Sequence, residues 1–247
     1  MKSRRVSVIM PAFNEGEHIH DNIMETNSVL GKDFDLDLVI VNDGSSDNTY
    51  SEALRAAEKL KNAVAVNLPV NVGKGNAIKE GFKYVKGDYV VFLDADLDLH
   101  PSQVPKLLKV MDGHKANVVI GSKYHPSSEL NYPWIRKLIS RVYALVLKIL
   151  FNLPLRDTQT GLKIYEYEVL KRVFPKILCK RYAYDLELLV NAHRLGYSIL
   201  EAPVVLNFRR PKKMGRMRPN DLYRTGLDTL AIFYRTYILK YYDSIKT

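Results

Sequence analysis

The chain has 247 residues, of which 47% are hydrophobic and 26% are charged, and its formal net charge is +10. This length allows one large domain, or one domain with an appendage, and the composition excludes a disordered chain. The single cysteine, Cys179, excludes a disulfide framework or a cysteine-based metal site and favours a reducing compartment.

Up to about residue 122, apolar runs alternate with amphipathic stretches. The apolar runs predict five strands, at residues 6–10, 36–41, 63–68, 89–93 and 117–120. The amphipathic patterns predict helices at roughly residues 15–30, 48–60, 74–86 and 101–111. This alternation is typical of βαβ units, so the fold class is α/β with a mostly parallel sheet flanked by helices.

Each of the first four predicted strands ends in a polar cluster. These clusters lie at residues 11–15, 42–47, 71–76 and 94–98. Ligands bind beyond the carboxyl ends of the strands in open sheets of this kind. The second cluster is also compatible with a simple turn and helix cap, but four clusters at one edge predict a binding site there.

The fourth cluster carries carboxylates on alternate residues, at Asp94, Asp96 and Asp98. Carboxylate oxygens suit Mg²⁺ or Mn²⁺, which proteins usually hold with one or two carboxylates and substrate phosphates. A solvated acidic turn would also explain the pattern in isolation. In the third cluster, Gly73-Lys74-Gly75 favours phosphate binding without being a P-loop, because the GxxxxGK[ST] spacing is absent. The absence of GxGxxG also disfavours a nicotinamide dehydrogenase.

Seven segments of the chain form a recognisable set. They are SVIMPAFNE at 7–15, VIVNDGSSDNT at 39–49, NVGKGNAIKEGF at 71–82, FLDADLDLHP at 92–101, GSKY at 121–124, RDTQTGLKIY at 156–165 and YDLELLVNAHRLGYSILEAPV at 184–204. In this order they resemble glycosyltransferase family 2, inverting enzymes with the GT-A nucleotide-sugar fold, and the resemblance covers nearly the whole chain. Within that family the chain looks most like the polyprenyl-phosphate glycosyltransferases, the dolichyl-phosphate mannose and glucose synthases.

The resemblance implies a donor site for a nucleotide sugar, with GDP-mannose and UDP-glucose both open. It makes Asp94 and Asp96 the DxD pair, acting in catalysis and in binding Mg²⁺ or Mn²⁺. Asp98 stands where relatives often have Gln. Because its carboxylate oxygen could also coordinate a cation, it is expected to be a third contributor to the metal site, after Asp96 and Asp94. The residues expected to bind the nucleotide sugar are Pro11, Ala12, Glu15, Asp43, Lys74, Asp94 and Asp96.

The acceptor implied by the resemblance is a polyprenyl (dolichyl) phosphate. Asp157 is then the candidate general base, although a phosphate monoester with a second pKa near ~6 needs little deprotonation at neutral pH. Asp157 could instead orient groups, or cap a turn. The cations expected to bind the acceptor phosphate, each of which could also be a solvated surface residue, are Lys123, Arg136, Arg141, Arg209 and Arg210.

The charge is concentrated in the second half of the chain. Residues 1–127 hold 15 Lys and Arg against 17 Asp and Glu, whereas residues 128–247 hold 22 against 10. A basic second half predicts an anionic partner, namely a membrane, a nucleic acid or a phosphate. Amphipathic helices near 133–153 and at the C-terminus fit a membrane interface, and they also fit packing on the sheet or on a second subunit.

We therefore expect a catalytic domain at 1–208, with a nucleotide-sugar half at 1–122 and an acceptor half at 123–208. A basic loop and an amphipathic helix follow at 209–247. With no signal peptide and no apolar run of spanning length, we expect a peripheral enzyme on the cytoplasmic face of a membrane, with an integral membrane partner or a homo-oligomer as options.

The expected function is transfer of a hexose, with inversion, from a nucleotide sugar to a polyprenyl phosphate. One alternative is a family 2 enzyme that extends a glycan or polysaccharide. A non-enzymatic binder of anionic lipid or nucleic acid would explain the charge but not the four polar clusters, so we expect no nucleic acid partner. A glycoside hydrolase would leave the glycine-lysine loop unexplained.

Overall fold

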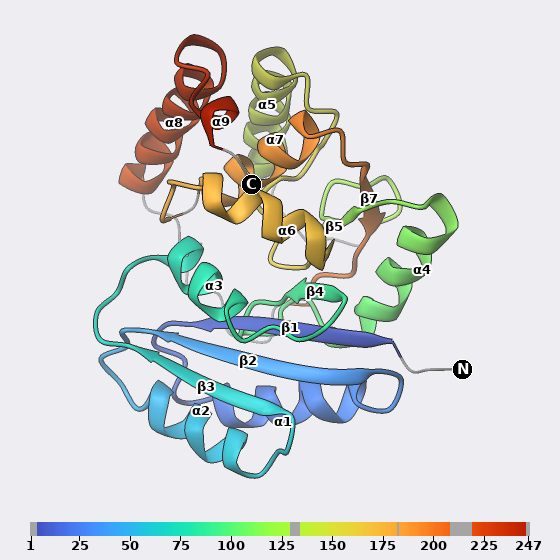
Figure 1. Ribbon diagram of the computed structural model, residues 1–247, viewed down its shortest axis with the longest axis vertical. Helices are drawn as coiled ribbons and strands as arrows, with labels where there is room; N and C mark the ends of the chain where they lie inside the picture. Colours follow the sequence, from blue (N-terminus) through green and yellow to red (C-terminus); the bar gives the residue numbers. More distant parts are fainter. Residues whose placement is uncertain (1–3, 129–133, 182, 208–218, 246–247) are drawn as a thin grey trace.

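The computed structural model describes residues 4–128, 134–181, 183–207 and 219–245, with residues 134–141 and 219–222 described by their backbone alone. These residues form an α/β fold built on one sheet (Figure 1). The strands are β1 (Arg5–Ala12), β2 (Asp35–Asp43), β3 (Ala63–Leu68), β4 (Tyr89–Phe92), β5 (Val118–Ser122), β6 (Lys163–Glu166) and β7 (Ile199–Pro203), in the sheet order β3-β2-β1-β4-β6-β5-β7.

The sheet is mostly parallel, as the sequence predicts. β1 pairs in parallel with β2 and β4, and β5 pairs in parallel with β7. β6 is antiparallel and lies between β4 and β5, so that Ile164 faces Val91 on one side and Val119 on the other. All five predicted strands are present. The sequence pattern did not predict β6 and β7, which have only four and five residues.

The helices of the first half follow the predicted order, with differences at their ends. They are α1 (Ile19–Leu30), α2 (Thr49–Glu58), α3 (Lys74–Phe82) and α4 (Val104–His114), with a short 3₁₀ turn at Pro101–Gln103. α1 begins four residues later than predicted, because Glu15 heads a turn. Its carbonyl accepts from the N–H groups of His18 and Ile19, and its own N–H donates to Thr49 Oγ1.

Both faces of the sheet are covered by helices, which explains why the central strands are apolar throughout. In β1, Val8 and Met10 point into a core shared with α1, α2 and α4. Ile9 points into the opposite core, which α3 shares with the helices of the second half. Figure 1 shows α1 and α2 on one side of β1–β3, and α3 on the other.

The second half adds α5 (Trp134–Phe151), α6 (Tyr167–Val173), α7 (Tyr184–Arg194), α8 (Pro219–Phe233) and α9 (Tyr241–Ser244), with a π-helical turn at Tyr234–Ile238. α5 and α8 pack together. The Tyr143 hydroxyl lies 3.0 Å from Thr229 Oγ1, and the rings of Phe151 and Phe233 are 6.2 Å apart.

Among the described residues, no helix has the length and hydropathy needed to cross a bilayer. The expected domain boundaries stay a prediction.

Candidate active site

The carboxyl end of β2 and the glycine-lysine loop are joined by Asp43. This side chain is 4% exposed, and its two oxygens accept the backbone N–H groups of Val72 and Gly73 at 2.8 and 3.1 Å. Gly73 has a φ of +95°, and a Cβ there would lie 2.4 Å from the carbonyl oxygen of Lys180. Glycine is therefore required at this position, and Asp43 fixes the loop at the start of α3.

The loop after β1 is tied to the loop after β2. Asn14 adopts a φ of +54°, with its N–H donating to Ser45 Oγ and its Oδ1 accepting the N–H of Ser46. Pro11 and Ala12, expected to bind the nucleoside, are the last residues of β1. The structure thus brings the residues expected to hold the nucleoside to one corner, where β1, β2 and the glycine-lysine loop meet.

The acidic turn after β4 separates polar from apolar side chains by strict alternation. Ala95 and Leu97 are buried in the core, whereas the residues that alternate with them, Asp94, Asp96 and Asp98, are partly exposed. Leu97 has a φ of +52°, which turns the chain sharply, and Asp96 Oδ1 accepts the N–H of Asp98 at 3.2 Å. A short-range turn therefore presents the predicted carboxylates at the carboxyl edge of the sheet.

Lys74 connects the glycine-lysine loop to this acidic turn. Its Nζ lies 2.5 Å from Asp94 Oδ1, and the two side chains are 29% and 37% exposed. Burial acts to lower the pKa of Lys74, but the carboxylates of Asp94, Asp185 and Asp96 outweigh that effect, so the pKa is raised above its ordinary value. The ammonium is therefore charged at neutral pH and sits among carboxylates.

A buried ion pair that the sequence analysis did not single out lies beneath Lys74. Lys163, in β6, donates to Asp185, in α7, and to the carbonyl oxygen of Thr160. Burial lowers the pKa of Lys163, and the Asp185 carboxylate opposes this effect. The signal was available, since Lys163 lies between Leu162 and Ile164, and a lysine inside an apolar strand needs a buried partner.

The loop at 157–161 reaches Asp94 from the basic half of the chain. A Cβ on Gly161 would lie 2.2 Å from Asp94 Oδ2, so a larger residue at this position would displace the Asp94 carboxylate. Asp157, at the start of the loop, is 4% exposed and accepts Lys123 at 3.2 Å from the ammonium and 2.9 Å from the backbone N–H. Glu201 in turn accepts the N–H of Asp157. Hydrogen bonds of Asp157 thus fix the start of this loop, and Gly161 lies against the acidic turn.

The other cations expected at the acceptor phosphate lie outside this description. Arg209 and Arg210 fall outside the described residues, and the side chains of Arg136 and Arg141 do so too.

Within the described ranges, no three histidine, cysteine, aspartate or glutamate side chains are grouped so that they could hold a metal ion by themselves. Oxygens of a bound ligand would have to complete a metal site on the acidic turn.

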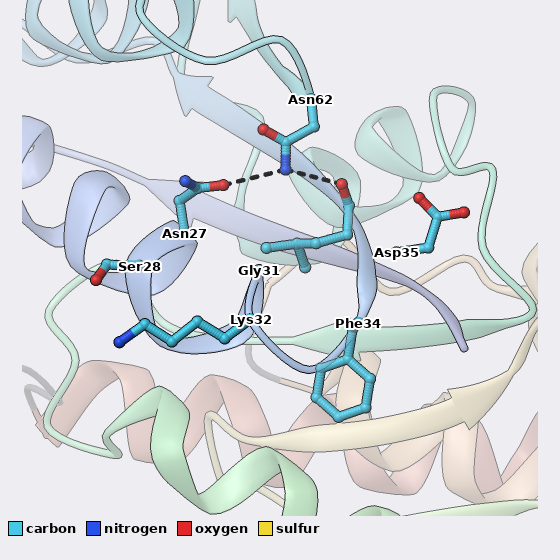
Figure 2. Close-up of a pocket in the computed structure, with 8 residues that line it drawn as sticks. Asn27, Ser28, Gly31, Lys32, Phe34, Asp35 and Asn62 are labelled. Carbon is cyan, nitrogen blue, oxygen red and sulfur yellow. Dashed lines mark hydrogen bonds between the residues drawn. The ribbon is translucent and has the colours of Figure 1, made fainter. Parts of the chain in front are cut away.

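The pocket in Figure 2 lies at the opposite edge of the sheet, where α1 ends and β2 begins. It measures about 460 Å³, and Asn62 Nδ2 spans it by donating to Asn27 Oδ1 and to the carbonyl oxygen of Leu36. None of the expected site residues lines it. The pocket is therefore separate from the site at the carboxyl edge.

Solved structures with this architecture are glycosyltransferases with the GT-A fold. A glucosyl-3-phosphoglycerate synthase from Mycobacterium tuberculosis aligns with a TM-score of 0.70 and 24% identity over 94% of this chain and 80% of that chain. The same synthase in complex with Mn²⁺, uridine diphosphate and glucosyl-3-phosphoglycerate gives a TM-score of 0.69 and 24% identity over 94% of this chain and 79% of that one. The architecture is thus that of a GT-A glycosyltransferase.

Sequence comparison identifies the family. Residues 7–174 match the family described as Glycosyl transferase family 2. The dolichyl-phosphate β-glucosyltransferase ALG5A of Trichomonas vaginalis is 33% identical over 243 residues, which cover 93% of this chain and 74% of that protein. The ALG5D protein of the same organism, also a dolichyl-phosphate β-glucosyltransferase, is 31% identical over 247 residues, with the same coverage. The chain belongs to glycosyltransferase family 2.

Proposed function

We propose that the protein transfers glucose from UDP-glucose to a polyprenyl phosphate of the dolichyl type, with inversion at the anomeric carbon. The observation that carries this proposal is the contact of Gly161 with Asp94. It places a loop from the basic half, where an anionic acceptor would bind, directly against the donor edge. The names of the relatives favour a glucosyl donor over a mannosyl one.

The donor would lie across the carboxyl edge, with its nucleoside near Asp43 and its diphosphate near Lys74. Asp96, assisted by Asp94, would hold Mg²⁺ or Mn²⁺ together with diphosphate oxygens. A partly exposed carboxylate pair that needs ligand oxygens to complete its coordination fits the way these ions usually bind. When bound, the ion neutralises the charge that develops on the leaving nucleoside diphosphate.

The reaction is a single displacement. A phosphate oxygen of the acceptor bonds to the anomeric carbon as the bond between that carbon and the diphosphate breaks, and the nucleoside diphosphate leaves. Because a phosphate monoester is largely a dianion at neutral pH, no protein base is required. Asp157 is buried and paired with Lys123, and it would hold that lysine toward the acceptor phosphate rather than remove a proton.

A lipid acceptor requires access to a membrane surface, and α5 and α8 offer an apolar face for it. On α5, Val142, Leu145 and Ile149 are exposed, and on α8, Leu227 and Leu230 are exposed. Since the two helices pack together through their inner sides, these residues would form one continuous surface. We infer that this apolar surface lies in a membrane interface, beside an otherwise basic half of the chain.

The direct test is to incubate the purified protein with Mn²⁺ or Mg²⁺, polyprenyl phosphate, and UDP-glucose or GDP-mannose, and to extract the lipid products. We expect glucosylated lipid phosphate that depends on the metal. Mannosylated lipid alone would refute the donor assignment. Sugar on a soluble glycan or protein alone would refute the acceptor.

A further inference from the structure

Arg181 is an exposed residue that stands over the glycine-lysine loop, just before α7. The backbone around it is fixed to that loop, because the carbonyl oxygen of Lys180 accepts the N–H of Gly75 at 3.0 Å. A Cβ on Gly73 would lie 3.0 Å from Arg181 Cγ. The arginine side chain therefore leaves the backbone in contact with the loop that begins α3.

The Arg181 guanidinium is not neutralised by a bonded partner. Within the described part of the chain it makes no hydrogen bond and no ion pair, whereas Lys74 is paired with Asp94 and Lys123 with Asp157. The charge of Arg181 acts to lower the pKa of the Asp43 carboxyl, which burial raises, and it acts in the same direction on the pKa of Asp228 of α8. Its fork of N–H donors is thus available to a ligand at the catalytic edge.

The chemistry at this edge calls for such a cation. The diphosphate of a nucleotide sugar is anionic, and it becomes more so as its bond to the sugar breaks. Lys74 already shares its charge with the carboxylates of Asp94, Asp185 and Asp96. A second cation beside the loop would offset the charge that Lys74 cannot, and a planar guanidinium matches two phosphate oxygens at once.

We propose that Arg181 binds the diphosphate of the donor together with Lys74 and stabilises the nucleoside diphosphate as it leaves. This inference rests on the proposed function, because it assumes a nucleotide-sugar donor. It does not depend on the identity of the acceptor.

The test compares Arg181→Ala with Lys180→Ala, a matched control that removes the same charge from the neighbouring exposed residue. Affinities for UDP, GDP and uridine are measured by calorimetry with Mn²⁺, and thermal melting checks the fold. For the diphosphate that the wild-type protein binds, we expect Arg181→Ala to weaken affinity about tenfold while uridine affinity is unchanged. Lys180→Ala should leave the affinities for the diphosphate and for uridine intact. The diphosphate affinity of Arg181→Lys should lie between those of Arg181→Ala and the wild-type protein.

Three results would overturn the inference. Unchanged diphosphate affinity in Arg181→Ala would overturn it directly. If the KM for polyprenyl phosphate rose at the same time, Arg181 would belong to the acceptor site instead. Equal loss of diphosphate and uridine affinity would indicate a distorted loop instead. If the wild-type protein bound neither UDP nor GDP, the proposed function would fail with the inference. If only the lipid product were missing, the acceptor assignment alone would fail.

Discussion

Asp96 is the side chain on which the expected metal dependence rests, because it is the expected principal carboxylate ligand of the DxD pair, whereas the carboxylate of Asp94 is paired with Lys74. We predict that Asp96→Asn lowers kcat about 100-fold, by analogy with the loss of one charge-stabilising group in other enzymes. The stabilisation that Mn²⁺ and nucleotide together give in thermal melting should also be lost.

Asp98→Asn is the matched control for this prediction, because Asp98 lies in the same turn and is expected to be only a third contributor. It should lower kcat less than Asp96→Asn does. Near wild-type turnover in Asp96→Asn, measured by formation of lipid-linked sugar, would remove the metal argument altogether.

Cys179 should be inert in the folded protein. Burial, reinforced by the carboxylate of Glu187, raises its pKa to about 12. A raised thiol pKa means that less thiolate is present at any given pH, about a thousandfold less than for a free cysteine at neutral pH. We predict that iodoacetamide alkylates the folded protein negligibly between pH 7 and pH 9 and alkylates the urea-unfolded protein rapidly. Mass spectrometry measures the extent of alkylation in both states. Reaction of the folded protein at the rate of free cysteine would show that the thiol is accessible.

At the residue scale, the sequence predicted which residues would gather at the carboxyl edge of the sheet, but it did not predict the bonds between them, and their role in donor binding stays a prediction. Asp94 and Lys74 come from clusters recognisable by their position after apolar runs, and they do form a pair. The buried pair of Lys163 and Asp185 was missed because its partners are 22 residues apart and meet only when β6 and α7 pack. A lysine between Leu162 and Ile164 is a local signal that a buried partner exists, but no local pattern identifies Asp185 as that partner.

Among the elements, the turn into α3 offers a clean test of backbone strain. We predict that Gly73→Ala destabilises the protein by about 1–3 kcal/mol, because alanine is unfavourable at a φ of +95° and its Cβ would meet the carbonyl oxygen of Lys180. Nucleotide binding should weaken as well, since the N–H of Gly73 is held by Asp43. Urea denaturation and calorimetry measure the two effects.

The control for this substitution is Gly113→Ala in α4. A Cβ at Gly113 would meet nothing within 4 Å. Alanine in a helix is more favourable than glycine, so this variant should gain about 0.5–1 kcal/mol. Equal stability changes in both variants would contradict the strain argument.

At this scale the sequence predicted the strands that are continuous apolar runs, including the four-residue β4, and missed β6 and β7. The five strands of the first half were recognisable because buried parallel strands are continuous apolar runs. β6 has four residues, begins with a charged one and follows a polar loop. Its place in the sheet depends on strands from both sides, which no local pattern encodes.

For the whole molecule, we predict binding to anionic vesicles through the apolar surface of α5 and α8. Ile149→Glu combined with Leu230→Glu should reduce co-sedimentation with phosphatidylserine vesicles about tenfold, because each places a charge where apolar area would be buried. The KM for long-chain polyprenyl phosphate should rise, and UDP affinity should be unchanged.

Leu54→Glu is the control for vesicle binding, since Leu54 is an exposed leucine on α2, which covers the opposite face of the sheet. It should leave co-sedimentation unchanged. Equal vesicle binding by the double variant and the wild-type protein would refute the proposed membrane surface. If the double variant instead differed from the wild-type protein in how its oligomeric state depends on concentration, the surface would contact a second subunit.

The position of β6 has a consequence for how the chain acquires its structure during synthesis. β4 and β5 are joined only through β6, so neither can complete its pairing until the ribosome has made residue 166. Until then β4 presents an open edge, the kind of surface on which unfinished chains associate. The long sequence separation of these contacts also predicts slow folding. The strand that carries Lys163 therefore also determines when the open edge of β4 is covered, and β7 completes the sheet later by pairing with β5.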